Sequence, residues 1–198
     1  MEEKIVYFAQ PGIDNTEATL RLAIERAKAR GIKKIVLAST RGQTAQLAAE
    51  RLTGTGISLV VIPHQYSYTR PQQFPPELVG MLEKQGHRVH FGTGLFHTEN
   101  LYGNTTPRVI AFFLRTFSQG MKVCFEIIFM AVDGGCVAPG EQVIVIAGTG
   151  RGSDTAVVAL AASSKDLPML HISEIICKPL QTQQRIPNFV PAEEFKSP

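Results

Sequence analysis

Residues 33–52 read KKIVLASTRGQTAQLAAERL, and their pattern indicates the class of fold. It begins with an apolar run over 33–38, which predicts a buried strand, and it ends with a segment from Gln43 to about Leu52 that predicts a helix. Only the polar residues 39–42 separate the two. A strand followed at once by a helix is the repeating unit of α/β proteins with a parallel sheet.

Further apolar runs along the chain predict more strands. They are rich in Val and Ile without strict alternation, which is typical of strands covered by helices on both faces. The predicted strands are 4–9, 33–38, 57–62, 88–91, 142–147 and 170–177.

Helical segments alternate with these strands. The predicted helices are 14–30, 43–52, 75–86, a segment from 106 with Ile110, Phe113, Leu114 and Phe117 on one face, 122–132, and a last helix over 153–163 that Ser153 caps. Asp14 and Glu17 are predicted to form a capping pair at the start of the first helix, and Gly31 to end it. The alternation predicts a three-layer α/β/α sandwich.

The length and composition fit a single soluble domain. The chain has 198 residues, of which 44% are hydrophobic, so we expect one α/β domain over 1–198 with a proline-containing C-terminal arm over 179–198. The N-terminus is acidic and leads straight into a predicted strand, without the pattern of a signal peptide. The three cysteines are far apart, which favours reduced thiols. These features together predict a cytoplasmic protein.

Charge and hydropathy argue against two classes of partner. The net charge is +3, but the basic residues are scattered and form no stripe for nucleic acid. The longest apolar run, 123–132, contains Glu126 and is too short for a bilayer, which needs about 20 residues. We therefore expect neither nucleic acid nor membrane as a partner. A homo-oligomer is compatible with the sequence, which does not specify its symmetry.

Five loops that follow predicted strands have unusual content. In a parallel sheet these loops share the edge where ligands bind, and long polar loops at that edge favour a functional interpretation. The loops are 10–16, 39–44, 63–74, 92–106 and 148–155.

The loop 39–44 has the composition of an anion site. The N-terminus of a helix leaves backbone amides unpaired and carries a partial positive charge, so it can hold a phosphate. Gly42 would allow close approach, Ser39, Thr40 and Thr44 would add hydroxyls, and Gln43 an amide. In the alternative interpretation, Thr40 merely caps the helix and the loop is an ordinary polar turn.

The loop 148–155 contains three glycines between predicted elements. Gly148, Thr149 and Gly150 could add contacts to a ligand held by the first loop. A dinucleotide fingerprint is not complete, because Ser153 stands where its third glycine belongs. The alternative is a flexible turn before a capped helix.

Three runs of the chain, NTEATLRLAIERAKARGIKKIVLASTRGQTAQLAA (15–49), GMKVCFEIIFMAVDGGCVAPGEQVIVIAGTGRGSDTAVV (120–158) and ISEIICKP (172–179), carry a resemblance. The first resembles the C-terminal domain of pyruvate kinase, and the set resembles a family of stand-alone proteins with that domain's fold. The resemblance implies a mostly parallel, mixed sheet of five or six strands with one antiparallel strand. It also implies a phosphate pocket at residues 39–44, although Arg41 precedes Gly42 where pyruvate kinases have Ser. The catalytic barrel is missing, so kinase activity is not implied.

The remaining loop residues suggest a flat, phosphorylated ligand. In the loop 63–74, Tyr66, Tyr68 and Phe74 could stack on a ring, with His64 and Arg70 for polar contacts; in the alternative interpretation these rings simply cover the sheet edge. Asn15 either caps the first helix or faces the pocket. We therefore predict binding of a mononucleotide such as flavin mononucleotide (FMN), or of a sugar phosphate, at the carboxyl edge of the sheet.

An enzyme is the alternative, either a flavin-dependent oxidoreductase or a transferase that acts on a phosphorylated substrate. The titratable loop residues that could serve it are His64, His97 and Glu99, and no catalytic residue can be assigned. Lys122 and Glu126, one helical turn apart, are interpreted first as a structural ion pair. No spacing typical of a metal site occurs, so no metal is expected.

Overall fold

The structure is a computed structural model that describes residues 3–66, 68, 71–97 and 106–181. Its strands form one seven-stranded sheet in the order β1-β7-β6-β5-β2-β3-β4. Strand β6 is antiparallel to both of its neighbours, and the others run parallel to one another. The strands are β1 (Val6–Phe8), β2 (Lys34–Ala38), β3 (Ser58–Ile62), β4 (Arg88–Val89), β5 (Gln142–Ala147), β6 (Thr155–Leu160) and β7 (His171–Pro179).

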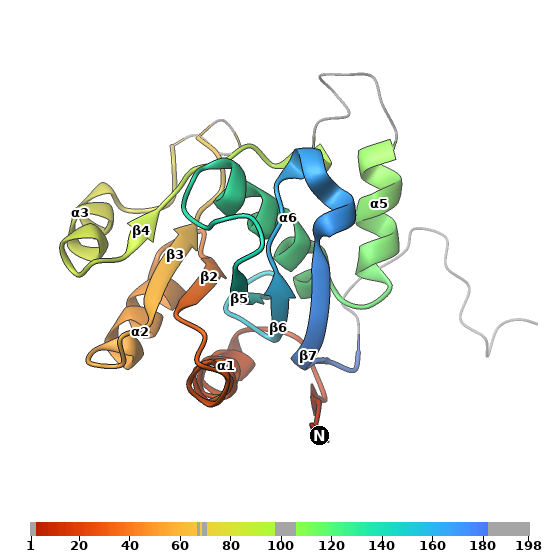
Figure 1. Ribbon diagram of the computed structural model, residues 1–198, viewed down its shortest axis with the longest axis horizontal. Coiled ribbons are helices and arrows are strands. Elements are labelled where there is room, and N and C mark those ends of the chain that lie inside the picture. The colour runs from red at the N-terminus through yellow and green to blue at the C-terminus, as the bar shows by residue number, and fades with distance from the viewer. Residues whose placement is uncertain (1–2, 67, 69–70, 98–105, 182–198) are drawn as a thin grey trace, which may run out of the picture.

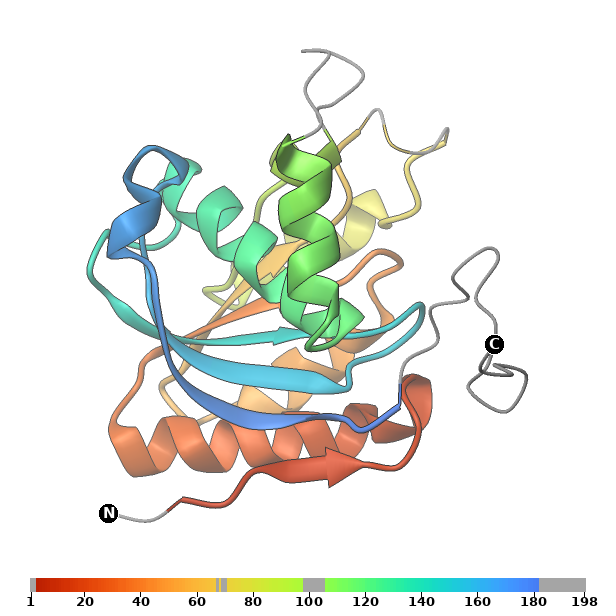
Figure 2. The same ribbon diagram turned by 90° about the vertical axis from the view of Figure 1, so that its right-hand side faces the viewer.

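Helices cover both faces of this sheet. One layer contains α1 (Thr16–Arg30), α2 (Gln43–Leu52) and α3 (Pro76–Lys84), and the opposite face is covered by α6 (Gln119–Asp133) (Figures 1 and 2). Helix α5 (Thr106–Arg115) packs on the outside of α6 (Figure 2). Three short 3-10 helices complete the fold: η1 (Ile13–Asn15), η2 (Leu95–His97) and η3 (Ser164–Met169). The predicted three-layer α/β/α sandwich is confirmed.

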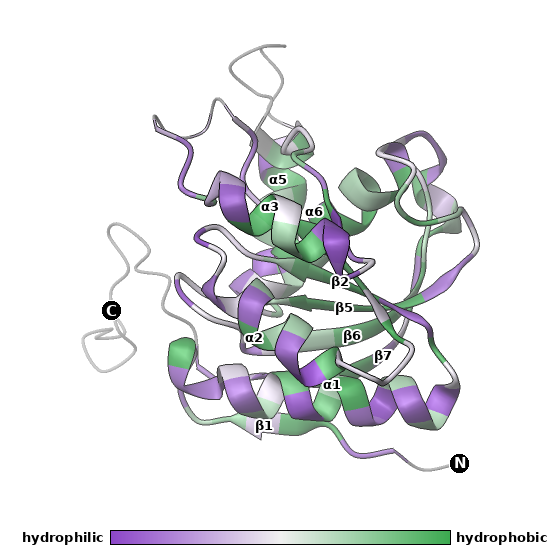
Figure 3. Cartoon of the chain, turned by 90° about the vertical axis from the view of Figure 1, so that its left-hand side faces the viewer, coloured by the Kyte–Doolittle hydropathy of each residue, from purple (hydrophilic) through white to green (hydrophobic). Residues whose placement is uncertain are grey.

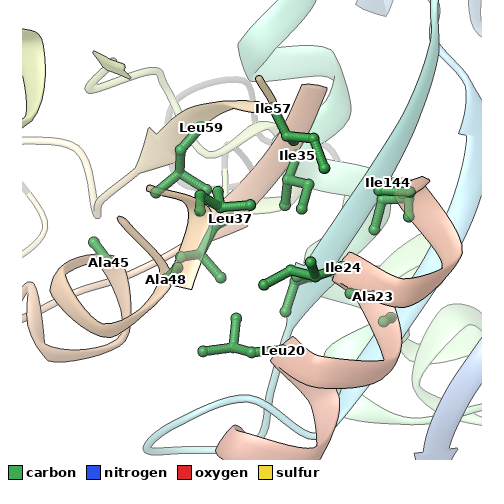
Figure 4. Packing of buried hydrophobic residues seen from close by; sticks show 14 of the residues in the cluster. Leu20, Ala23, Ile24, Ile35, Leu37, Ala45, Ala48, Ile57, Leu59 and Ile144 are labelled. Atoms are coloured by element: carbon green, nitrogen blue, oxygen red, sulfur yellow. The ribbon is translucent and has the colours of Figure 1, made fainter. Parts of the chain in front are cut away.

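Alternate residues of each central strand serve the two hydrophobic cores. In β2, Ile35 and Leu37 lie in the core shared with α1 and α2, whereas Val36 lies in the core shared with α6. Figure 4 shows the first core, where Leu20 and Ile24 of α1 approach the strand residues. Because both faces of the strands are buried, the strands consist mainly of apolar residues without alternation. The helices that cover them have apolar residues toward the sheet and polar residues toward solvent (Figure 3).

The last predicted helix is wrong, because residues 155–160 form strand β6. Its sequence, TAVVAL, is buried except for Leu160, and it pairs with β5 from Ala147–Thr155 to Gln142–Leu160. A short apolar run does not distinguish a buried strand from a helical segment by periodicity alone. Ser153 therefore caps no helix. The sheet has seven strands, more than the five or six that the resemblance implies, and its one antiparallel strand is β6.

The predicted details of α5 and α1 also need correction. Of the four residues expected on one face of α5, Leu114 is buried and Ile110 partly buried, but Phe113 and Phe117 are 65% and 47% exposed. Only a narrow stripe is covered, because α5 packs mainly on α6 and η2.

At the start of α1 no side chain caps the helix, so the predicted capping pair does not form. Gly31 ends the helix in the left-handed conformation, as predicted. The predicted C-terminal arm overlaps β7 at Pro179, and its residues 182–198 lie outside the described residues.

Candidate ligand cavity

A cavity of about 560 Å³ lies at the carboxyl edge of the sheet. The loops after β2, β3 and β5 form part of its wall, and these loops lie at one edge because their strands are parallel (Figure 2). Residues of α6 and the last residue of α5, Arg115, complete the wall. The volume falls within the range of about 300–1,000 Å³ that is typical of small-molecule sites.

The loop 39–44 joins β2 to α2 with its first hydroxyl turned back on the helix. Ser39 Oγ accepts a hydrogen bond from the Ala45 amide at 3.3 Å, and the Ser39 amide donates to the Ile62 carbonyl at 3.2 Å. Thr40 makes no such bond in the described part of the chain, so Ser39, and not Thr40, binds the first turn of α2.

Gly42 is needed for the turn, but it faces away from the cavity. Its φ of 86° lies in the left-handed region, and a Cβ atom built on it would come 2.3 Å from Leu78 Cδ2 of α3. Gly42 therefore fixes the loop against α3, and the prediction that it borders the anion is not supported by its position.

The first turn of α2 leaves donors without partners. Within the described ranges, the backbone N–H groups of Gln43 and Thr44 donate no hydrogen bond, and neither do the hydroxyls of Thr40 and Thr44. Thr40, Gln43 and Thr44 all line the cavity. These donors belong to the positive end of the α2 dipole, so the wall of the cavity at this point suits an oxyanion.

The loop 148–154 is held by a carboxylate of the protein itself. Asp154 is fully buried, and its Oδ2 accepts hydrogen bonds from the amides of Gly12 at 3.0 Å and Thr149 at 3.1 Å. Its Oδ1 accepts from the Thr155 hydroxyl at 2.8 Å. Thr149 does not line the cavity, whereas Gly148 and Gly150 do.

The loop 10–16 supports this arrangement from behind and does not reach the cavity. Thr16 Oγ1 accepts from the Ser153 amide at 2.9 Å, and Thr19 Oγ1 donates to the Ser153 carbonyl at 3.2 Å. Asn15 Nδ2 donates to the Gln10 carbonyl at 2.8 Å. The Asn15 side chain thus stabilises its own loop, and Asn15 is not among the lining residues.

Of the three rings predicted in the loop after β3, Tyr68 lines the cavity, Tyr66 does not, and Phe74 is buried in the core; Arg70 lies outside the described residues. His64 lines the cavity, and its ring lies 4.3 Å from that of Tyr68, which lines it too. Tyr66 instead packs against Phe91, with ring centroids 4.6 Å apart, and is not a lining residue. The side chain of His97 and all of Glu99 lie outside the described residues.

The structure therefore brings together most of the predicted ligand residues but not all of them. The lining includes Ser39, Thr40, Gln43, Thr44, His64, Gly148 and Gly150. It does not include Asn15, Gly42, Tyr66 or Thr149.

Of the charged residues at the cavity, Arg115 and Arg151 were missed in the sequence. Arg41, Arg115 and Arg151 line it, together with the pair formed by Lys122 and Glu126. Arg115 Nε donates to Gln119 Oε1 at 2.7 Å, which orients its guanidinium. Glu126 is the sole carboxylate among the lining residues that the structure describes, so the wall is positive overall. Only the tertiary packing of α5 and α6 brings Arg115 and Lys122 to this edge.

The family model described as "Pyruvate kinase, alpha/beta domain" matches residues 17–159 of the chain. The chain belongs to this family. The match covers α1, α2, α6 and most of the sheet, including both glycine-containing loops.

Two solved structures are similar to this member of the pyruvate kinase alpha/beta domain family. One is a pyruvate kinase from Cryptosporidium parvum, with 16% identity, a TM-score of 0.42, and coverage of 74% of this chain and 23% of that one. The other is the Cryptosporidium parvum pyruvate kinase in complex with ADP, with 18% identity, a TM-score of 0.39, and coverage of 72% and 22%. The chain thus spans about a quarter of the length of these pyruvate kinases.

Two other features, a membrane-spanning helix and a metal site, are absent from the part of the chain that the structure describes. None of their helices has both the length and the apolarity needed to cross a bilayer. Nor do they contain a group of three or more His, Cys, Asp or Glu side chains arranged to hold a metal ion.

Proposed function

We propose that the protein binds a small phosphorylated molecule in this cavity, with the phosphate at the first turn of α2. The observation that carries the proposal is the set of donors without partners at Gln43 and Thr44, on a cavity wall that also contains three arginines. A phosphate accepts several hydrogen bonds and carries negative charge, so it matches both properties.

FMN is the specific ligand that we propose, and a sugar phosphate is the second candidate. The volume of about 560 Å³ is sufficient for a mononucleotide. Tyr68 and His64 offer ring faces to a flat group, in the loop where the sequence suggested such contacts. The glycines Gly148 and Gly150 leave room for the polar chain between the phosphate and the ring.

The phosphate position is tested by Thr44→Glu. A carboxylate at Thr44 repels an anion at the same point, and an acidic residue in the first turn is favourable for the helix, so the fold is retained. We expect the affinity for inorganic phosphate and for FMN, measured by calorimetry, to fall by about tenfold or more. The matched control is Gln46→Glu, which adds the same charge to an exposed position of α2 that does not line the cavity.

Two outcomes would contradict the proposal. Equal affinities in Thr44→Glu and Gln46→Glu would place the anion elsewhere, and a wild-type protein that binds neither phosphate nor FMN would remove the function. Whether the ligand is FMN is tested separately, by the absorbance of the purified protein at the flavin bands and by its thermal stabilisation on adding FMN. If both are absent while inorganic phosphate binds, the ligand is another phosphate ester.

An enzyme that acts on the phosphorylated ligand is the alternative, and His64 at the cavity wall is the observation in its favour. For a flavin-dependent oxidoreductase or a transferase, His64→Asn should abolish turnover while binding is retained. In a protein that only binds the ligand, the same variant changes affinity alone.

The expected homo-oligomer stays a prediction.

A further inference from the structure

We propose that the cavity has a second recognition site, at Lys122 and Glu126 of α6, which selects phosphorylated ligands with a neighbouring hydrogen-bond acceptor and donor at the end remote from the phosphate. The inference rests on the proposed phosphate site. It specifies the part of the ligand that the loop 39–44 does not bind.

The pair is buried and lies on the cavity wall. Lys122 Nζ donates to Glu126 Oε2, and the two side chains are only 2% and 8% exposed. The other carboxylate oxygen, Glu126 Oε1, accepts the Phe96 amide at 3.1 Å, and Lys122 Nζ lies 5.5 Å from the centre of the Phe96 ring. Both charged groups are therefore fixed in position.

Stability does not explain an ion pair at this place. The buried neighbours of the pair on α6 are apolar, among them Met121, Cys124 and Ile127. Removing two charges from water is costly, and apolar residues of similar size are often equally or more stabilising. A charge pair that lies on the wall of a cavity, beside the bonded side chains of Arg115 and Gln119, is in position to contact a ligand there.

The position of the pair separates it from the phosphate site. Helices α2 and α6 cover opposite faces of the sheet, and the cavity reaches both of them at the sheet edge. A ligand whose phosphate lies at the start of α2 directs its other end toward α6.

The chemistry of the pair defines the group that it can bind. An ammonium group only donates hydrogen bonds and a carboxylate only accepts them. Side by side, they match a group that presents an acceptor next to a donor. Vicinal hydroxyls of a sugar have this property, as does the carbonyl and N–H edge of a heterocyclic imide.

The test uses four probes on the wild-type protein: inorganic phosphate, butyl phosphate, ribose 5-phosphate and FMN. Butyl phosphate has an apolar remote end, ribose 5-phosphate a diol, and FMN an imide. We expect ribose 5-phosphate or FMN to bind about tenfold or more tightly than butyl phosphate, which corresponds to one or two hydrogen bonds to charged groups. Whichever of the two is preferred identifies the remote group.

The double variant Lys122→Met with Glu126→Gln is the matching protein test. The methionine replaces the aliphatic stem, and the glutamine oxygen still accepts the Phe96 amide, so thermal stability should be retained. The preference over butyl phosphate should disappear, while the affinity for inorganic phosphate stays within about twofold.

The outcomes separate this inference from the proposed function. If phosphate and butyl phosphate bind but the wild type shows no preference, or if the double variant keeps the preference, the second site is overturned and the phosphate site stands. If none of the four probes binds the wild type, both proposals fail. Should the double variant not fold, the wild-type comparison of the probes alone decides.

Discussion

The loops after β2 and β5 are made of the same kinds of residue and border the same cavity. They differ in how many of their backbone amides already have a hydrogen-bond acceptor within the protein. In 39–44, the amides of Gln43 and Thr44 are without partners in the described structure. In 148–154, Asp154 binds the Thr149 amide and Thr16 binds the Ser153 amide, whereas the glycine amides of this loop have no partner in the described structure. Glycines and hydroxyls are thus not enough to define an anion site. The two loops differ in how far the protein itself satisfies their backbone amides.

The largest effect is expected from Asp154→Ala. The substitution leaves the amides of Gly12 and Thr149 without their acceptor, and the Thr155 hydroxyl keeps only Ser118 Oγ as a partner. A buried donor without a partner costs about 1–3 kcal/mol, and these two amides are partly buried, so we expect the free energy of unfolding to fall by about 2 kcal/mol or more. Urea denaturation measures it.

The control for this variant is Asp14→Ala. Asp14 is exposed, lies in the neighbouring loop and accepts no capping bond, so its loss should change stability by about 0.5 kcal/mol at most. Similar values for the two variants would show that Asp154 does not hold the loop 148–154.

The fold was largely predictable because the signals that define it are local. Unbroken Val and Ile in 33–38, 57–62 and 142–147 identified the central strands, and Gly31 identified the end of α1. Strand β6 was not predictable in this way. TAVVAL is as apolar as a buried helix segment, and only its pairing with β5 and β7 makes it a strand.

The site was predictable to the extent that it lies in loops at strand ends. The hydroxyls and amides of 39–44 follow directly from the order of strand, loop and helix. The roles of Gly42 and Asn15 did not follow, because they depend on contacts with Leu78 and Gln10. The charges from α5 and α6 reach the cavity only through tertiary packing, which no spacing in the sequence encodes.

The titration of Cys177 reports mainly on the burial of its thiol. Burial, together with the negative charge of Asp154, raises the pKa of the Cys177 thiol to about 11, against the lowering effect of hydrogen bonds with Thr19 and Ala156. The unfolded thiol ionises at its ordinary, lower pKa, so the folded state binds the proton more tightly. The stability contribution is therefore complete below about pH 9 and is lost as the pH rises toward 11.

We expect the free energy of unfolding to fall with pH in this window by about 1.4 kcal/mol per unit for this thiol. Cys177→Ala should show a shallower decline than the wild type, when urea denaturation is repeated from pH 8 to 10.5. Parallel curves for the two proteins would mean that Cys177 ionises as readily in the folded chain as in the unfolded one.

A smaller effect compares one glycine from each loop. Gly42 and Gly150 both have positive φ, of 86° and 72°, so alanine is strained at either position. At Gly150 an added Cβ meets nothing within 4 Å, whereas at Gly42 it meets Leu78 Cδ2 at 2.3 Å. We expect Gly42→Ala to be less stable than Gly150→Ala by about 1 kcal/mol, as judged by thermal unfolding. The reverse order would mean that Leu78 moves aside at little cost and that α3 does not fix the loop.

The smallest effect is local, and it tests the comparison most directly. When inorganic phosphate is titrated into labelled protein, the amide resonances of Gln43 and Thr44 should shift and saturate together, because a bound oxyanion accepts from them. The amide resonances of Gly12 and Thr149 should not shift, because both amides already donate to Asp154. Shifts of equal size in both loops would mean that the carboxylate yields to an external anion. In that case the Asp154 carboxylate and the added phosphate would compete for the same amides, and the second loop would be part of the ligand site as well.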